Sequence, residues 1–153
     1  VALDKISGAE VTAVEIDETA FSYLETNVKG NNSSVKPVMA DALEICETFA
    51  DGELDLIVSN PPYIKSADIE TLQKEVQLEP RLALDGGEDG CDFYREIVSR
   101  WSRKLKKGGA LAFELGENQA DAVKALMAEQ GFSDFKISLD FGGVQRAIIG
   151  TLL

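Results

Sequence analysis

Apolar residues follow two different spacings along this chain, and the two spacings alternate. Short, dense apolar runs predict buried strands, and they lie at Val11–Asp17, Val35–Ala40, Leu54–Ser59 and Ala110–Gly116. Segments with an apolar residue every three or four positions predict helices, and they lie at residues 17–29, 42–49, 92–105 and 117–130. This alternation indicates an α/β domain with a mostly parallel sheet.

The C-terminal residues depart from the alternation. Two apolar segments, Phe132–Leu139 and Gln145–Leu153, are separated only by residues 140–144. Two strands joined by so short a connection are typical of an antiparallel hairpin. We therefore expect the mostly parallel sheet to end in such a hairpin.

A long irregular segment, residues 60–90, separates the third predicted strand from the next long helix. We expect a helix near Asp68–Val76 within it, followed by Pro80 and a turn-rich DGGEDG sequence. A connection this long inside a compact domain is usually functional. The helix after it carries an apolar stripe that predicts core positions, and Gly108-Gly109 is expected to end it; the stripe comprises Phe93, Tyr94, Ile97, Trp101 and Leu105.

Acidic residues stand where the first two strands end. Ligands of parallel α/β sheets bind beyond the carboxyl ends of the strands, so these positions are candidates for a binding site. Glu15 and Asp17 end the first strand, and Asp41 follows the second. A carboxylate there can accept two hydrogen bonds from a ribose diol. Asp17 and Asp41 are equally explained as N-caps of the helices that follow, and Glu15 as a surface residue.

The third strand ends in Asn60-Pro61-Pro62-Tyr63, which is a more specific pattern. Both prolines fix their φ angle and lack an N–H, and a residue before proline is held extended. The Asn60 amide oxygen and the Pro61 carbonyl therefore form a rigid pair of acceptors. Such a pair matches a planar –NH2 group, on whose flat face Tyr63 can pack. A simple proline turn would explain neither the amide nor the aromatic ring.

Composition narrows the possible chemistry. The chain has no histidine, which excludes Ser-His or Cys-His nucleophiles and histidine-based metal sites, so we expect no metal. The net charge of −12 argues against direct nucleic-acid binding. The densest basic stretch, Arg100–Lys107, is expected to be the solvated end of a helix. The cysteines Cys46 and Cys91 predict free thiols in a reducing cytoplasm, and no segment predicts a membrane span or a signal peptide.

The sequence NPPY after an apolar strand resembles the amino-methyltransferase signature of S-adenosylmethionine-dependent enzymes. The following segment, VQLEPRLALDGGEDGCDFYREIV, is similar to the one that follows NPPY in the HemK/PrmC family of protein-(glutamine-N5) methyltransferases. The similarity runs from about Val11 to a last strand that resembles the family's at QRAIIG. It implies a Rossmann-like class I methyltransferase sheet. The implied activity is transfer of a methyl group from S-adenosyl-L-methionine, giving S-adenosyl-L-homocysteine, to a glutamine in the Gly-Gly-Gln loop of peptide-chain release factors.

The same resemblance implies roles for individual residues. Glu15, with Ile16 beside it, matches the ribose ligand, and Asp41 matches the residue that holds the adenine amino group, with Ala42 beside the ring. Asn60 and the Pro61 carbonyl would hold the glutamine amide, and Asn60 would also contact the cofactor. Pro62 would keep the turn rigid, and Tyr63 would line the pocket.

The family's Gly-rich loop and the strand before it have no match here, since the start VALDKISGAEV resembles the helix that follows that loop. We therefore expect residues 1–153 to be an N-terminally truncated catalytic domain whose first strand is missing. Two other functions stay open. One is an amino-methyltransferase acting on adenine or guanine in nucleic acid, and the other is a non-catalytic methyltransferase-like subunit. A dinucleotide-dependent oxidoreductase would need a glycine pattern that the chain lacks.

Overall fold

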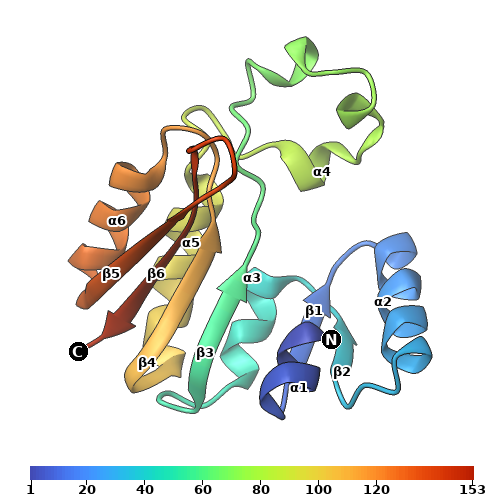
Figure 1. The fold of residues 1–153 in the computed structure, drawn as a ribbon, viewed down its shortest axis with the longest axis vertical. Coiled ribbons are helices and arrows are strands. Elements are labelled where there is room, and N and C mark those ends of the chain that lie inside the picture. Colours follow the sequence, from blue (N-terminus) through green and yellow to red (C-terminus); the bar gives the residue numbers. More distant parts are fainter. The chain divides into compact units, whose positions relative to one another are not determined.

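The computed structural model describes all 153 residues, which divide into two compact units, Val1–Thr48 and Phe49–Leu153 (Figure 1). Each unit has a sheet of its own, with the strand orders β1-β2 and β3-β4-β6-β5. Strands and helices alternate along the chain, as the apolar spacing predicts, and the α/β class is confirmed. No helix is both long and apolar enough to cross a membrane.

The N-terminal unit is a parallel strand pair with short helices. Its helices and strands are α1 (Ala2–Ser7), β1 (Thr12–Glu15), α2 (Glu18–Gly30), β2 (Lys36–Met39) and α3 (Ala42–Ile45), followed by a 3-10 turn at Cys46–Thr48. β1 and β2 are parallel, with Val14 opposite Val38, so their carboxyl ends lie at the same edge. Pro37 can lie within β2 because this strand pairs on one side only.

One carboxylate joins α1 to the turn before β2. Asp4 is buried and accepts hydrogen bonds from the Ser33 hydroxyl at 2.6 Å and from the Ser34 backbone N–H at 3.1 Å. The Ser34 hydroxyl donates to its second oxygen. The serine hydroxyl groups stabilise the ionised form and lower the pKa of Asp4 from 3.8 to about 2.

This shift predicts a pH dependence for the N-terminal unit. Because the folded-state pKa is depressed, Asp4 stabilises the fold fully above its unfolded pKa of about 3.9. That contribution is lost as the pH falls through the folded value of about 2. We expect Asp4→Asn to unfold at lower urea concentration than the parent chain at pH 7, and the difference to close between pH 4 and pH 2. Urea titrations followed by circular dichroism measure this, and a difference independent of pH would contradict it.

The C-terminal unit is a four-stranded sheet. Its regular elements are β3 (Leu54–Ser59), α4 (Arg81–Leu84), α5 (Asp92–Trp101), β4 (Leu105–Glu114), α6 (Ala120–Glu129), β5 (Phe132–Leu139) and β6 (Gln145–Leu152). β3 is parallel to β4, whereas β6 runs antiparallel to both β4 and β5. The predicted C-terminal hairpin is confirmed, and the sheet is mixed.

The core of this unit lies between the sheet and the helices α5 and α6 (Figure 1). Leu111, Phe113 and Ile148 are buried on that face of the sheet. Tyr94 of α5 meets Phe113 edge-on, with ring centroids 5.2 Å apart. The aromatic stripe is therefore core, as predicted, although Phe93 at its start is only half-buried. Val123 and Met127 anchor α6 in the same core.

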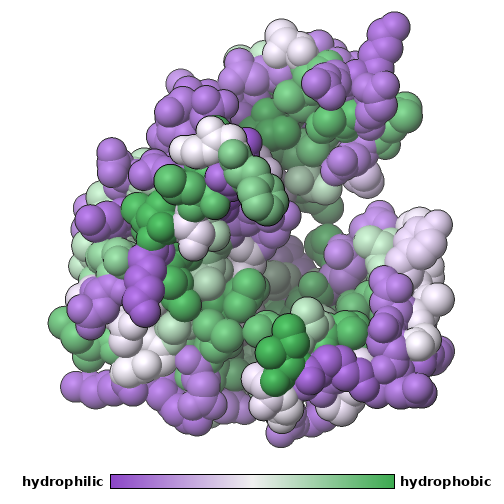
Figure 2. Space-filling view, viewed as in Figure 1, coloured by the Kyte–Doolittle hydropathy of each residue, from purple (hydrophilic) through white to green (hydrophobic).

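The opposite face of the sheet is open, which corrects the expectation of a buried third strand. Leu56 and Val58 of β3 are 41% and 56% exposed. They lie in register with Ala110 and Ala112 of β4, and Figure 2 shows apolar side chains gathered on this face. β3 pairs with β4 alone, and no helix of the unit lies over these side chains (Figure 1). An apolar run of residues specifies a strand without specifying whether both faces are covered.

Three details of the predicted helices were wrong. The helix expected near Asp68–Val76 is replaced by 3-10 turns at Ile69–Thr71 and Val76–Leu78, and α4 was not predicted. The glycine pair expected to end a helix lies inside β4, which starts at Leu105 after a 3-10 turn at Ser102–Lys104. The register shifts there, and Gly108 adopts a φ of 78°, which glycine tolerates.

The basic stretch is not wholly solvated, contrary to expectation. Lys104 is only 4% exposed. Its ammonium donates to the Phe49 carbonyl at 2.8 Å and to the Asp51 carboxylate at 2.9 Å. This lysine therefore ties the loop before β3 to the start of β4, which is a structural role.

Candidate active site

Asn60-Pro61-Pro62-Tyr63 follows β3 directly, at the carboxyl end of that strand. Pro61 is buried, Pro62 and Tyr63 are half-buried and Asn60 is exposed. All peptide bonds of the chain are trans. The backbone of the tetrapeptide is thus packed in place, while the Asn60 side chain is exposed and its amide makes no hydrogen bond within the chain.

Three glycines lie against the tetrapeptide so closely that an added side chain would force neighbouring atoms to move. A Cβ atom at Gly86 would lie 2.7 Å from the Tyr63 Cα and 2.9 Å from the Pro62 carbonyl oxygen. At Gly90 it would lie 2.5 Å from the Tyr63 carbonyl oxygen, and at Gly116 it would lie 2.9 Å from the Tyr63 ring. These glycines allow two separate segments, residues 86–90 and the residues after β4, to approach the turn.

A buried glutamine holds the end of the tetrapeptide. The Gln119 amide nitrogen donates to the carbonyl oxygens of Tyr63, at 2.9 Å, and of Gly90, at 3.2 Å. Its side-chain oxygen accepts from the Gly116 N–H at 3.0 Å and lies 3.4 Å from the Tyr94 hydroxyl. Sequence reasoning missed Gln119, since a polar residue at the start of a predicted helix carries no distinguishing local signal.

The Tyr63 phenol points to the end of β4. Its hydroxyl donates to the Glu114 carboxylate at 3.3 Å. Burial, and then the negative charge of Glu114, raise the pKa of Tyr63 above its usual value of 10.0. These effects favour the neutral phenol, which donates to Glu114. It can line a pocket and orient Glu114, which is the role expected for an aromatic residue beside a bound amide.

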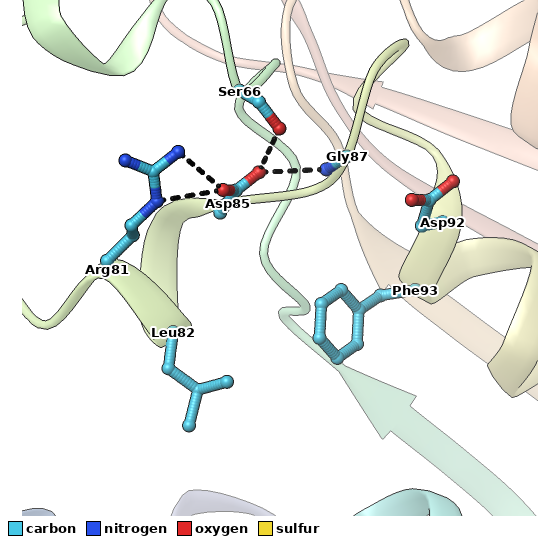
Figure 3. A pocket seen from close by; sticks show the side chains of 7 residues that line it. All are labelled: Ser66, Arg81, Leu82, Asp85, Gly87, Asp92 and Phe93. Atoms are coloured by element: carbon cyan, nitrogen blue, oxygen red, sulfur yellow. Dashed lines mark hydrogen bonds and ion pairs between the residues drawn. The ribbon is translucent and has the colours of Figure 1, made fainter.

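The long segment after the tetrapeptide returns to it. Ile64 and Asp85 form a parallel bridge, in which the Ile64 N–H donates to the Leu84 carbonyl at 2.9 Å. The Asp85 carboxylate then accepts from the Ser66 hydroxyl at 2.5 Å and from Arg81 at 3.0 Å (Figure 3). These contacts lower the pKa of Asp85, and the Ser66 hydroxyl has the largest effect. A cavity of about 510 Å³ opens beside this cluster, with Phe93 across from Asp85 in Figure 3.

The acidic candidates lie together at the carboxyl edge of the β1–β2 pair. One Glu15 oxygen accepts from the backbone N–H groups of Ile16, at 2.8 Å, and Asp17, at 2.9 Å. Asp17 caps α2 through the Ala20 N–H at 2.9 Å, and Asp41 caps α3 through the Leu43 N–H. The capping explanation is therefore correct for both aspartates. Glu15 and Asp41 each use one oxygen in these local bonds, so the second oxygen of each can accept from a ligand.

The predicted residues thus fall into two sets. Glu15, Ile16, Asp41 and Ala42 belong to the N-terminal unit, where they follow neighbouring parallel strands. Asn60–Tyr63 belong to the C-terminal unit and follow β3. Each set occupies the carboxyl end of parallel strands, which is the usual place for ligands in such sheets.

Comparisons with known proteins place this chain among methyltransferases of one family. Residues 1–88 match the family model described as methyltransferase small domain. A release factor glutamine methyltransferase of Geobacter sulfurreducens is 41% identical over 145 residues, covering 94% of this chain and 50% of that protein. One of Clostridium acetobutylicum is 38% identical over 144 residues, with 92% and 50% covered. The chain spans about half the length of these curated relatives. A crystal structure of a methyltransferase from Pyrococcus furiosus superposes with a TM-score of 0.73 at 25% identity, covering 98% of this chain and 66% of that one.

Proposed function

This chain belongs to the methyltransferase small domain family, and we propose that it forms the acceptor-binding part of a glutamine methyltransferase. The reaction would move a methyl group from S-adenosyl-L-methionine to the side-chain nitrogen of a glutamine in the Gly-Gly-Gln loop of peptide-chain release factors, in the cytoplasm. The observation that carries this proposal is the packed Asn60-Pro61-Pro62-Tyr63 turn with an exposed amide at the carboxyl end of β3. The relatives named as release factor glutamine methyltransferases support it.

The residues of the N-terminal unit fit the cofactor. The second oxygen of Glu15 can accept from the ribose hydroxyls, and that of Asp41 from the adenine amino group. Ile16 and Ala42 stand next to these carboxylates and would lie against the nucleoside. The bound cofactor would supply a methyl sulfonium, which is electrophilic enough to need no covalent intermediate on the protein.

The acceptor residues would mainly align the nitrogen. A carboxamide nitrogen is a poor nucleophile because its lone pair is delocalised into the carbonyl group. Asn60 Oδ1 and the Pro61 carbonyl oxygen would accept one N–H each, which fixes the nitrogen in line with the methyl group. As positive charge develops on the nitrogen, both acceptors bind it more strongly, and this lowers the barrier. The proton can then leave to water, so the absence of histidine is compatible with the reaction.

A methyl-transfer assay tests the proposal. In a hybrid protein this chain replaces the matching segment of the Geobacter sulfurreducens relative, and isothermal titration calorimetry first establishes that the hybrid binds S-adenosylhomocysteine. Radiolabelled cofactor is then offered with release factor, with ribosomal RNA or with DNA. We expect label in the release factor only, on the glutamine of its Gly-Gly-Gln loop. Label in nucleic acid would favour an amino-methyltransferase of bases, and cofactor binding with no transfer would favour a non-catalytic subunit.

Replacing Glu15 is expected to weaken cofactor binding without lowering the maximal rate. Glu15→Ala removes a contact to the ribose, which lies far from the methyl group and acts alike in the ground and transition states. We expect the KM for S-adenosylmethionine in the hybrid to rise at least about tenfold, with kcat within a factor of about two. Glu15→Gln keeps the oxygen that accepts from the backbone N–H groups of the following turn. Its KM should therefore lie between those of the parent hybrid and Glu15→Ala. Glu129→Ala, on the exposed face of α6, is the control. A drop in kcat at unchanged affinity would contradict the ribose role.

A further inference from the structure

Gln119 is a buried polar side chain that the proposed chemistry does not itself use. It is 8% exposed and stands at the N-cap of α6. A glutamine amide offers two donor hydrogens and an oxygen with two acceptor sites. Both hydrogens bind backbone carbonyls, those of Tyr63 and Gly90, and the oxygen binds the Gly116 N–H and lies within reach of the Tyr94 hydroxyl. This complete set of partners fixes the side chain in one orientation.

Two glycines leave room for this side chain. A Cβ atom at Gly116 would lie 2.4 Å from the Gln119 oxygen, and one at Gly90 would lie 2.6 Å from its nitrogen. The Tyr94 hydroxyl also donates to the Glu114 carbonyl at 2.8 Å, so Gln119 reaches a rigid part of β4 and α5. The glutamine therefore connects the tetrapeptide to the core of the C-terminal unit.

The hydrogen bond from Gln119 to the Tyr63 carbonyl constrains the two predicted acceptors, on Asn60 and Pro61, because the backbone between them is restricted. β3 fixes the tetrapeptide at its first residue, and Gln119 fixes the carbonyl of its last residue. Between them, Pro61 and Pro62 have fixed φ angles, which leaves few rotations free. Holding both ends therefore sets the direction of the Pro61 carbonyl. Loss of the Gln119 hydrogen bond would let the Pro61 carbonyl rotate away from the substrate –NH2 group.

We propose that Gln119 is a positioning residue for methyl transfer, acting through the Tyr63 carbonyl on the acceptors Asn60 and Pro61. This inference rests on the proposed function, which it extends to a residue that need not touch the substrate. A displacement of about 1 Å in an aligned reacting group can cost about 100-fold in rate. The effect should therefore appear in the rate of transfer rather than in cofactor affinity.

Gln119→Glu tests this with little change of shape. The carboxylate still accepts from Gly116, but it has no hydrogen to donate to Tyr63 or Gly90 and repels both carbonyl oxygens. In the hybrid protein we expect kcat to fall about 10- to 100-fold, with the KM for S-adenosylmethionine within a factor of about two. Gln130→Glu makes the same chemical change at the exposed C-cap of α6 and should leave both constants unchanged.

Amide hydrogen exchange on the 153-residue chain gives a readout that needs no substrate. We expect Gln119→Glu to speed exchange at least about tenfold in residues 63–66, while β4 and α5 keep the rates of the parent chain. Faster exchange over the whole C-terminal unit, or an unchanged kcat, would overturn the positioning role. If the hybrid with Gln119 intact binds cofactor and methylates nothing, the proposed function fails. Locally faster exchange in Gln119→Glu would in that case still show that the hydrogen bonds of Gln119 restrain the turn.

Discussion

Asn60→Ala is expected to lower methyl transfer at least about 100-fold, the loss that removal of one positioned hydrogen-bonding group commonly causes. Asn60 is exposed and its amide makes no hydrogen bond within the chain, so the melting temperature should stay within about two degrees of the parent value. Activity is measured as methyl incorporation into release factor by the hybrid protein, and stability by thermal unfolding.

Asn60→Asp provides the matched control for this change. The aspartate retains an acceptor oxygen at the same reach, so it should recover part of the activity that alanine loses. S-adenosylhomocysteine affinity should be alike in all three proteins, since Asn60 is assigned mainly to the acceptor amide. Near-normal turnover in Asn60→Ala, or equal loss in both variants, would show that this amide does not orient the substrate.

Gly86→Ala is expected to harm stability and activity together. The added Cβ would lie 2.7 Å from the Tyr63 Cα and 2.9 Å from the carbonyl oxygens of Pro62 and Gly90. All three are backbone atoms, which cannot move aside as a flexible side chain can. Overpacking of this kind costs about 1–3 kcal/mol, and the displaced tetrapeptide should lose at least about tenfold in methyl transfer. Thermal unfolding and the methylation assay measure the two effects.

Gly30→Ala separates this steric effect from the general effect of replacing a glycine. Gly30 ends α2, and a Cβ there would meet nothing within 4 Å. Alanine at a helical position should stabilise the chain by about 0.5–1 kcal/mol, without changing transfer. If Gly86→Ala matches Gly30→Ala in both stability and methyl transfer, the close approach of residue 86 to Tyr63 determines neither property.

The pattern of apolar residues predicts most of the regular structure. It locates the six strands, the long helices and the C-terminal hairpin, because burial on one face leaves a period in the sequence. It fails for residues 60–90, where the chain is held by the Ser66 hydroxyl on Asp85 and by the Gln77 amide, which donates to the carbonyls of Glu70 and Leu72, and these bonds leave no period in the sequence. It also misplaces the start of β4. A glycine pair is typical both of a helix end and of a bulge in a strand, and the apolar pattern does not distinguish the two.

The candidate site is predicted only in part, for a similar reason. The backbone geometry of Asn60–Tyr63 is determined by the tetrapeptide itself, because prolines restrict the backbone of adjacent residues. Gln119, Gly90 and Gly116 act on the same turn from distant positions in the sequence, and no local pattern connects them to it. For Asp41, the sequence offers a helix cap and a ligand-binding role as alternatives, whereas one carboxylate has an oxygen for each purpose.

The bridge between Ile64 and Asp85 closes the intervening residues into a lobe whose two ends are fixed side by side. Loop-closure entropy rises slowly with length, by about 0.6 kcal/mol for each doubling. Residues 67–80 can therefore be lengthened, shortened or exchanged with little effect on the tetrapeptide anchored beside them. Such a lobe is a part of the molecule in which evolution can alter the surface beside the turn while the Asn60–Tyr63 tetrapeptide stays as it is.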